Sequence, residues 1–207
     1  MSGVPSSFVH RFEAGAEPGK ALLLLHGTGG GEDSLLGLGH VLAPGAALLA
    51  PRGKVLENGM PRFFRRFAEG VFDEADLRRR TKELADFVGE ARTAYALPAP
   101  IAVGFSNGAN IAAALLLLHP DVLAGAVLLR AMAPLAEAPT ADLHGKPVLL
   151  LSGIVDPIVP AGSALSLADQ LARNGAVVEH RRLPAGHALS QADVDRARAW
   201  LAELGAA

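Results

Sequence analysis

A serine lies between two glycines in the middle of the most hydrophobic part of the chain. The stretch reads Gly104-Phe105-Ser106-Asn107-Gly108, and an aliphatic run stands on each side of it. This is the G-x-S-x-G pattern of a nucleophile elbow, a sharp turn between a strand and a helix that exposes a serine hydroxyl. The pattern predicts that Ser106 is a nucleophile. On the five residues alone, a glycine-rich turn with an incidental serine is the competing interpretation.

A serine nucleophile needs a general base, and an elbow serine is followed in the chain first by an acid and then by a histidine. The histidines after Ser106 are His119, His144, His180 and His187. Only His187 follows a predicted strand, at the sheet edge where Ser106 is expected. The other three are expected at the opposite edge or within a strand. We therefore predict that His187 is the base, with an exposed loop histidine as the alternative.

The acid that orients the base should also follow a strand. Asp156 does so in the stretch LLLSGIVDPIVP, directly after the aliphatic run 146–153. No carboxylate follows the aliphatic run 123–132, which ends in Arg130-Ala131-Met132. Asp156 is therefore the predicted acid. The ordinary interpretation of an Asp-Pro pair is the start of a turn.

An oxyanion that forms at a serine needs two backbone N–H donors. Asn107, directly after the nucleophile, is one expected donor. Thr28 is the other, because it lies in the glycine-rich stretch HGTGGG of residues 26–31, which resembles an HGGG-type oxyanion loop. A phosphate cradle is the alternative for these glycines, but the rest of a nucleotide motif does not follow. We expect His26 to position this loop.

The elements that must hold these residues alternate along the chain. Strands are expected over residues 21–27, 46–53, 100–106, 123–132, 146–153 and 176–184, and helices over residues 32–43, 74–95, 107–120, 161–175 and 190–204. The strands are continuously aliphatic, which is typical of a parallel sheet with helices on both faces. We predict one three-layer α/β domain over residues 1–207, with a mostly parallel central sheet.

Residues 53–73 interrupt this alternation. They contain four of the eight phenylalanines together with glycine and proline, and a long insert in an α/β domain is often functional. We expect Phe63 and Phe64 from this insert, with Met132, to form a wall of a substrate pocket. The alternative, that these rings pack onto the core beneath, stays open at this point.

Composition excludes several other classes of protein. Of the 207 residues, 50% are hydrophobic and 19% are charged, as in folded globular domains, and the formal net charge of -2 argues against a nucleic-acid partner. The absence of cysteine excludes disulfides, thiolate metal sites and cysteine nucleophiles. No signal peptide and no apolar run of about 18 residues is visible. We therefore expect a cytoplasmic protein with no membrane span, no metal and no cofactor.

These motifs together resemble the α/β-hydrolase superfamily. More narrowly, the chain resembles the phospholipase/carboxylesterase family and its branch of small bacterial carboxylesterases. The motifs that carry the resemblance, in family order, are LLLLHGTGGGEDSLL, PRG at 51–53, GFSNGANIA, SGIVDPIVP and LPAGHALS. The resemblance implies a triad of Ser106, Asp156 and His187, with oxyanion donors from Thr28 and Asn107. Two departures count against neighbouring activities, because eukaryotic thioesterases have glutamine after the serine and dienelactone hydrolases use cysteine.

The resemblance implies hydrolysis of an ester or thioester without a cofactor. The expected function is a serine carboxylesterase that cleaves small-molecule esters of short-to-medium acyl chains through an acyl-enzyme. A thioesterase or a lysophospholipase would use the same triad, and a receptor that binds a small ligand on the same fold without catalysis is the alternative from another class. A weak homodimer is the expected assembly. The natural substrate cannot be inferred from these residues.

Overall fold

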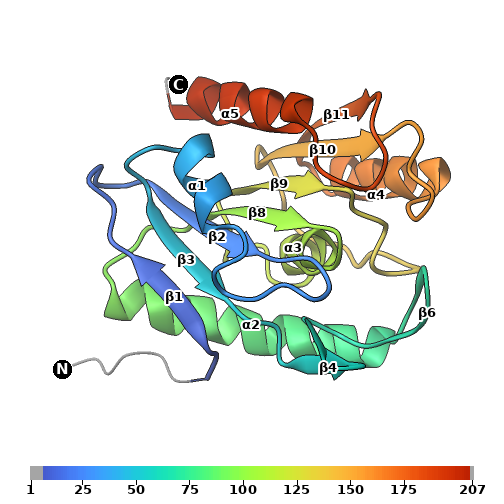
Figure 1. The fold of residues 1–207 in the computed structure, drawn as a ribbon, viewed down its shortest axis with the longest axis horizontal. Helices are drawn as coiled ribbons and strands as arrows, with labels where there is room; N and C mark the ends of the chain where they lie inside the picture. The colour runs from blue at the N-terminus through green and yellow to red at the C-terminus, as the bar shows by residue number, and fades with distance from the viewer. Residues whose placement is uncertain (1–6, 206–207) are drawn as a thin grey trace.

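A seven-stranded sheet runs through the middle of the molecule in the computed structural model, which describes residues 7–205. Its strand order is β1-β3-β2-β8-β9-β10-β11 (Figure 1). The strands are β1 (His10–Glu13), β2 (Ala21–Leu25), β3 (Ala47–Pro51), β8 (Ile101–Phe105), β9 (Gly125–Leu129), β10 (Pro147–Gly153) and β11 (Val177–Leu183). Only the β1–β3 pair of this sheet is antiparallel. The other strands are parallel, so their carboxyl ends meet at one edge.

Helices cover both faces of the sheet. One face carries α1 (Leu36–Leu42) and α5 (Gln191–Gly205), and the other carries α2 (Glu74–Ala94), α3 (Asn107–Leu118) and α4 (Ala161–Arg173) (Figure 1). In β2, Leu22 and Leu24 pack into the core beneath α1 and α5, whereas Leu23 and Leu25 pack into the opposite core. Successive side chains of a strand point to opposite faces, so a strand covered on both faces has no polar positions. The predicted three-layer architecture is confirmed.

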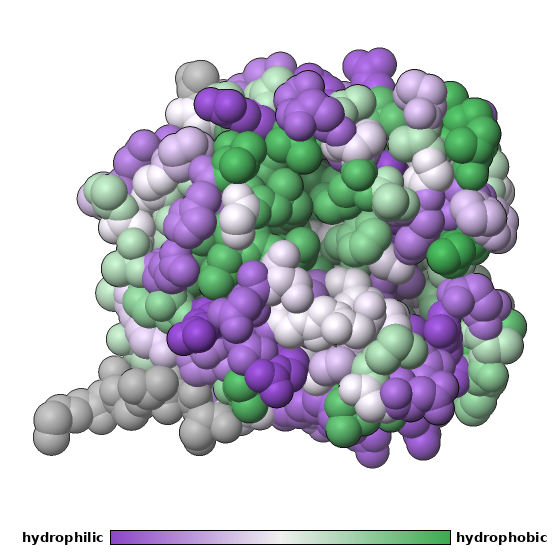
Figure 2. Space-filling model, viewed as in Figure 1, coloured by the Kyte–Doolittle hydropathy of each residue, from purple (hydrophilic) through white to green (hydrophobic). Residues whose placement is uncertain are grey.

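The structure differs from the elements expected from the sequence in two places: it contains an additional edge strand, and one helix is shorter. Strand β1 was not predicted, because its four residues, HRFE, are only partly buried and show no aliphatic run. The helix expected over residues 32–43 begins only at Leu36. A helix of seven residues covers less of the sheet than its neighbours do, and apolar side chains remain visible in a hollow between α1 and α5 (Figure 2). Within residues 7–205, no helix is long and apolar enough to cross a membrane.

One cavity of the structure lies away from Ser106. It has a volume of about 500 Å³ and is lined in part by Ala21, Ile101 and Ala124. These residues stand at or just before the amino ends of β2, β8 and β9. Ser106 follows the carboxyl end of β8, so the cavity lies at the opposite edge of the sheet. This cavity is therefore separate from the surroundings of Ser106.

The insert at residues 53–73 is made of two short hairpins, which the sequence did not predict. They are β4 (Val55–Glu57) with β5 (Met60–Arg62), and β6 (Arg66–Ala68) with β7 (Val71–Phe72). Between the hairpins, Phe63 and Phe64 turn into the core, where they are 2% and 0% exposed. Their expected place in the wall of a substrate pocket is wrong, because a ring enclosed by the core offers no surface to a ligand. Met132, at 6% exposure, lies with its sulfur close to Gly70 of the insert.

Burial of Phe64 leads to a prediction about stability. Phe64→Ala removes a ring that packs edge-on against Phe72, with 5.2 Å between ring centroids, and leaves a cavity in the core. We expect it to lower the free energy of unfolding by about 3–5 kcal/mol, measured by urea denaturation. Phe67→Ala is the matched control, because Phe67 is 76% exposed and its loss should change stability by about 0.5 kcal/mol or less. If the free energy of unfolding of Phe64→Ala were unchanged, the ring would not contribute to the core and would again be a candidate for the pocket wall.

Candidate active site

Ser106 occupies a strained turn between β8 and α3. Its backbone has φ 52° and ψ -114°, a left-handed conformation that non-glycine residues rarely adopt. A Cβ at Gly108 would lie 1.9 Å from the carbonyl oxygen of Leu25, and one at Gly104 would lie 2.6 Å from the carbonyl oxygen of Gly108. No side chain fits at either position, so both glycines are required by the close approach of helix and strand. The Ser106 N–H donates to the Leu129 carbonyl at 2.8 Å, which helps to hold the turn.

The structure brings Ser106, His187 and Asp156 together. The distance from His187 Nε2 to Ser106 Oγ is 3.0 Å, and the distance from His187 Nδ1 to Asp156 Oδ2 is 2.9 Å. An ionised carboxylate only accepts hydrogen bonds, so Nδ1 carries the proton and Nε2 is free to accept from the serine hydroxyl. His187 is 81 residues from Ser106 and 31 from Asp156, and the three residues follow β8, β10 and β11.

Asp156 is held in its ionised form. Its side chain is fully buried, which by itself disfavours the charge, but the N–H groups of Ile158 and Val159 donate to Oδ1 at 2.8 and 3.0 Å. These bonds and the bond from His187 outweigh the burial, and the pKa of Asp156 is lowered. A buried carboxylate that stays charged can fix the histidine tautomer and stabilise an imidazolium.

A second serine–histidine pair lies elsewhere in the sheet. His180 of β11 has its Nε2 2.7 Å from the Oγ of Ser152 in β10. Ser152 is only 5% exposed, and within residues 7–205 no carboxylate bonds to His180. This pair therefore lacks the acid and the access that the first pair has. His119 and His144, which follow α3 and precede β10, take no part in either pair.

The loop that carries Thr28 begins directly beside the elbow. Gly108 lies against the Leu25 carbonyl, and a Cβ at Gly27 would meet the ring of Phe105 at 2.8 Å. Within residues 7–205, neither the Thr28 N–H nor the Asn107 N–H donates to a protein acceptor. Asn107 is the first residue of α3, where backbone N–H groups lack partners within the helix. Both candidate donors are thus available to an oxyanion.

His26 ties this loop to the rest of the structure. It is 2% exposed, its Nδ1–H donates to the Gly27 carbonyl at 2.7 Å, and its Nε2 accepts from the Gly53 N–H at 3.0 Å. Its ring also packs against Phe63, with 4.7 Å between centroids. Burial lowers the pKa of His26, so the ring is neutral and keeps both backbone bonds. Its contacts are those of a residue that positions the loop.

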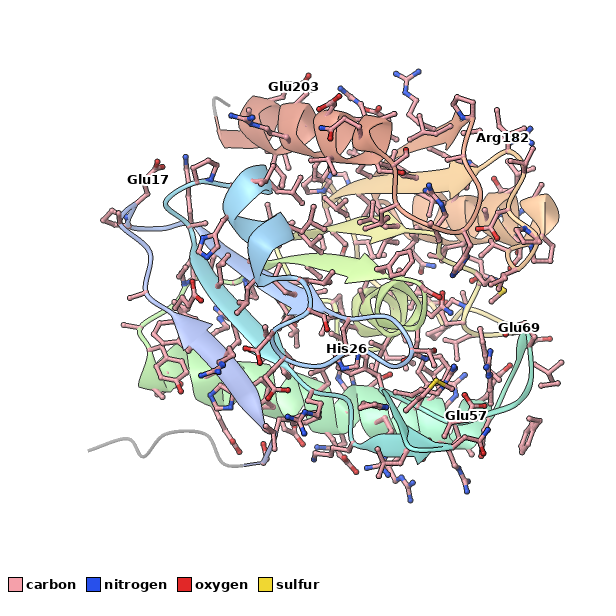
Figure 3. All side chains as sticks on the ribbon, in the orientation of Figure 1. Glu17, His26, Glu57, Glu69, Arg182 and Glu203 are labelled. Atoms are coloured by element: carbon pink, nitrogen blue, oxygen red, sulfur yellow. The ribbon has the colours of Figure 1, made fainter. Side chains whose placement is uncertain are left out.

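Sequence reasoning missed Arg62, which joins the insert to the Thr28 loop. Its side chain is only 3% exposed, and Nη1 donates to Thr28 Oγ1 at 2.6 Å and lies 3.2 Å from Glu57 Oε2. The Phe63 N–H donates to Asn107 Oδ1 at 2.8 Å, so the insert also holds the elbow. In Figure 3, His26 and Glu57 lie on the same side of the molecule, below α3. The only sequence signal was an arginine next to two phenylalanines, which does not reveal its partners.

Apolar side chains stand close to both halves of the site. Met60, 41% exposed, has its sulfur 3.6 Å from where a Cβ of Gly29 would lie, next to Thr28. Val155, 70% exposed, directly precedes Asp156. Both side chains are apolar and exposed, and each lies beside a segment that carries a candidate site residue, so we refer to Met60 and Val155 as the apolar rim. Within the described residues, no cluster of three histidine or carboxylate side chains could hold a metal ion.

Known proteins resemble this chain over nearly its whole length. The model of a family described as Phospholipase/Carboxylesterase matches residues 11–204. The protein named "Putative hydrolase MhqD" of Bacillus subtilis (strain 168) is 46% identical over 196 residues, which are 94% of this chain and 98% of that protein. The crystal structure of the Bacillus cereus carboxylesterase has a TM-score of 0.92 and 44% identity, covering 95% of this chain and 94% of that one. A carboxylesterase from Mesorhizobium loti has a TM-score of 0.90 and 35% identity, with 95% of each chain covered.

The environment of His26 predicts a pH dependence of stability. Its pKa in the folded protein lies below its ordinary value of about 6.5, so as the pH falls the unfolded chain takes up the proton first. The stabilisation due to His26 is therefore present above about pH 6.5 and is lost as the pH falls through the folded pKa. Since glutamine does not titrate, we expect the gap in unfolding free energy between the wild type and His26→Gln to narrow from about pH 7 to about pH 5.

The size of this effect has a limit and a control. The gap should narrow by at most about 1.4 kcal/mol for each unit by which the pKa of His26 is lowered, measured by urea denaturation at each pH. From about pH 7 to about pH 9 the histidine is neutral in both states, so the gap should stay constant there. A gap that widens on acidification would mean that His26 is charged in the folded protein.

Proposed function

The chain belongs to the phospholipase/carboxylesterase family and is a serine hydrolase, and from this premise we propose that it is a carboxylesterase with the catalytic triad Ser106, His187 and Asp156. The observation that carries the proposal is the pair of hydrogen bonds made by His187, one to the strained serine and one to a buried carboxylate. Nucleophile, base and orienting acid are then already in hydrogen-bond contact before any substrate binds.

The first half of the proposed reaction forms an acyl-enzyme. Ser106 Oγ attacks the ester carbonyl carbon while His187 Nε2 accepts the hydroxyl proton, and the Asp156 carboxylate stabilises the imidazolium. The carbonyl oxygen becomes an oxyanion that accepts hydrogen bonds from the N–H groups of Thr28 and Asn107. When the tetrahedral intermediate collapses, the ester C–O bond breaks and His187 Nε2–H gives its proton to the departing alkoxide. The products of this half are an alcohol and an acylated serine.

The second half releases the acid. A water molecule attacks the acyl carbon, and His187 Nε2 accepts one of the water protons. The same two N–H groups stabilise the second oxyanion. When the bond to Ser106 breaks, the serine oxygen recovers a proton from His187, and the carboxylic acid leaves. The residues end in their starting protonation states, so the cycle needs no cofactor.

We assign short-to-medium acyl esters as the substrate class. Met60 lies beside the Thr28 loop and Val155 beside the acid, and both are exposed apolar side chains that an acyl chain can cover. Met132, which follows β9, is nearly buried, and we assign it to the inner end of the site, where it would limit the depth open to an acyl chain. A few methylenes find apolar contacts on this rim, whereas a long chain extends past it into water. A thioesterase would use the same groups on a thioester carbonyl.

The role of Ser106 predicts a selective loss of reaction. A fluorophosphonate probe should add to the wild type once, seen as a single mass increase of the intact protein, and Ser106→Ala should show none. Hydrolysis of 4-nitrophenyl butyrate should fall by about 10⁴-fold or more in Ser106→Ala, since the nucleophile is lost. Ser152→Ala is the matched control, because Ser152 also bonds to a histidine but is buried. A wild type that binds esters and remains unlabelled would indicate a receptor without catalysis.

The apolar rim predicts a chain-length profile. Each methylene that finds apolar surface contributes about 0.8 kcal/mol, or roughly fourfold in kcat/KM, until the rim ends. We expect kcat/KM for 4-nitrophenyl esters to rise from acetate to butyrate or hexanoate and to fall for dodecanoate. Met60→Ala should shift the optimum, and Val177→Ala, exposed at the far end of β11, should not. An optimum at palmitate would instead favour a lysophospholipase.

A further inference from the structure

A fully buried arginine lies at the end of β9, where sequence reasoning had noted only that a carboxylate is missing. Arg130 directly follows the strand, has a side chain that is 0% exposed, and adopts a left-handed backbone with φ 59°. The backbone N–H of Arg130 donates to the Leu151 carbonyl of β10 at 2.9 Å. A buried charge and a strained backbone at one residue both cost free energy, so the surroundings must hold this side chain firmly.

All five N–H groups of the guanidinium have acceptors. The two charged contacts are a bidentate pair with Asp193, in which Nη1 donates to Oδ1 and Nη2 to Oδ2, both at 2.7 Å. The three remaining donors reach backbone carbonyls: Nε to Gly186 at 2.8 Å, Nη2 to Ala188 at 3.2 Å and Nη1 to Leu151 at 3.4 Å. Only the planar fork of arginine offers five donors in fixed directions, so lysine cannot reproduce this set.

Two of these carbonyls belong to the residues on either side of His187. Gly186 and Ala188 lie in the loop between β11 and α5, and each of them is bonded to the same rigid guanidinium. The carboxylate that holds the guanidinium, Asp193, lies in the first turn of α5 and also accepts from Ser190 N and Oγ. The guanidinium thus ties the histidine loop to the start of the next helix and to the strand below.

The charges of this cluster balance locally. Burial disfavours the Asp193 carboxylate, but the bonds from Arg130 and Ser190 outweigh it, and the pKa of Asp193 is lowered. The carboxylate therefore stays ionised and offsets the charge of the guanidinium next to the imidazole. We attribute the effect of the pair on His187 to the position of the loop, because the guanidinium bonds directly to the residues on either side of it.

We infer that Arg130, held by Asp193, is a positioning residue that sets the orientation of His187 between Ser106 and Asp156. The inference rests on the proposed role of His187 as base. The imidazole must accept from the serine on one side and donate to the acid on the other, so a small rotation of residues 186–188 breaks one bond or both. A misplacement of about 1 Å at a catalytic group can cost about 100-fold in rate.

The experiment compares arginine variants at two bidentate ion pairs, each of which has one member on α5. Arg130→Lys removes the fork, and the double change Arg130→Met with Asp193→Asn removes both charges, so that no buried charge is left without a partner. In the double variant, the amide oxygen of the new asparagine can still accept from Ser190 N. Arg196→Lys is the matched control, because Arg196 of α5 bonds to Glu179 of β11 at 2.8 and 2.5 Å and, within residues 7–205, makes no hydrogen bond to residues 186–188.

Four quantities are measured on each folded variant: the melting temperature, kcat, KM and the rate of fluorophosphonate labelling. We expect kcat and the labelling rate to fall together by about 100-fold in both Arg130 variants, with KM changed by about twofold or less. The double variant should recover melting temperature relative to Arg130→Lys without recovering kcat. Arg196→Lys should keep the wild-type kcat.

A fifth measurement does not depend on turnover. The Nδ1–H proton of His187, bonded to Asp156, should give a far-downfield ¹H resonance in the wild type that is lost in His187→Ala. It should be shifted or broadened in both Arg130 variants and unchanged in Arg196→Lys. A wild-type resonance and a wild-type kcat in either folded Arg130 variant would overturn the inference. Failure of the proposed function is distinguishable, because the wild type itself would then neither label nor hydrolyse esters.

Discussion

The backbone contact between Gly108 and the Leu25 carbonyl determines the arrangement of the candidate site. Because α3 starts this close to β2, Ser106 has no room for an ordinary backbone conformation and projects from the sheet edge. The same contact places the start of the Thr28 loop beside the first free N–H groups of α3. The positions of the proposed nucleophile and of the candidate oxyanion donors are therefore consequences of one close approach. The insert stabilises this arrangement through two hydrogen bonds, one from Arg62 to Thr28 and one from the Phe63 N–H to the Asn107 side chain.

A second close approach of the backbone joins the loop of the proposed acid to the loop of the proposed base. A Cβ at Gly153 would lie 2.4 Å from the Ala185 carbonyl and 2.6 Å from that of Gly186, so the histidine loop lies directly on the end of β10. The N–H groups of Ile154 and Val155 donate to Leu183 and Ala185 at 2.8 and 3.2 Å. The loops of Asp156 and His187 are thus bonded to each other before any side chain contributes. The hydrogen bond between their side chains forms within a prearranged backbone.

Local patterns in the chain were sufficient to predict the layers and the three proposed catalytic residues. Continuous aliphatic runs indicate buried parallel strands, and parallel strands bring their carboxyl ends to one edge. The G-x-S-x-G motif could therefore select Ser106, and chain order together with position at that edge could select Asp156 and His187. The roles of Arg62 and Arg130 could not be predicted, because their acceptors lie up to 63 residues away and follow no spacing rule. Phe63 and Phe64 were misassigned because an aromatic residue looks alike in sequence whether it lines a pocket or fills the core. The hairpins of two or three residues per strand are too short for periodicity to be detected.

The proposed base, His187, lies in the loop that follows the last strand of the sheet, and that strand lies at the edge. β11 has only β10 as a neighbour, and most of its residues are partly or fully exposed. During synthesis, Ser106 and Asp156 emerge before β11 and the loop that follows it, so in a partly made chain Ser106 has no His187 to accept its proton. Such a serine is a weak nucleophile. With the proposed triad, the order of the elements therefore delays reactivity until the last strand has joined the sheet.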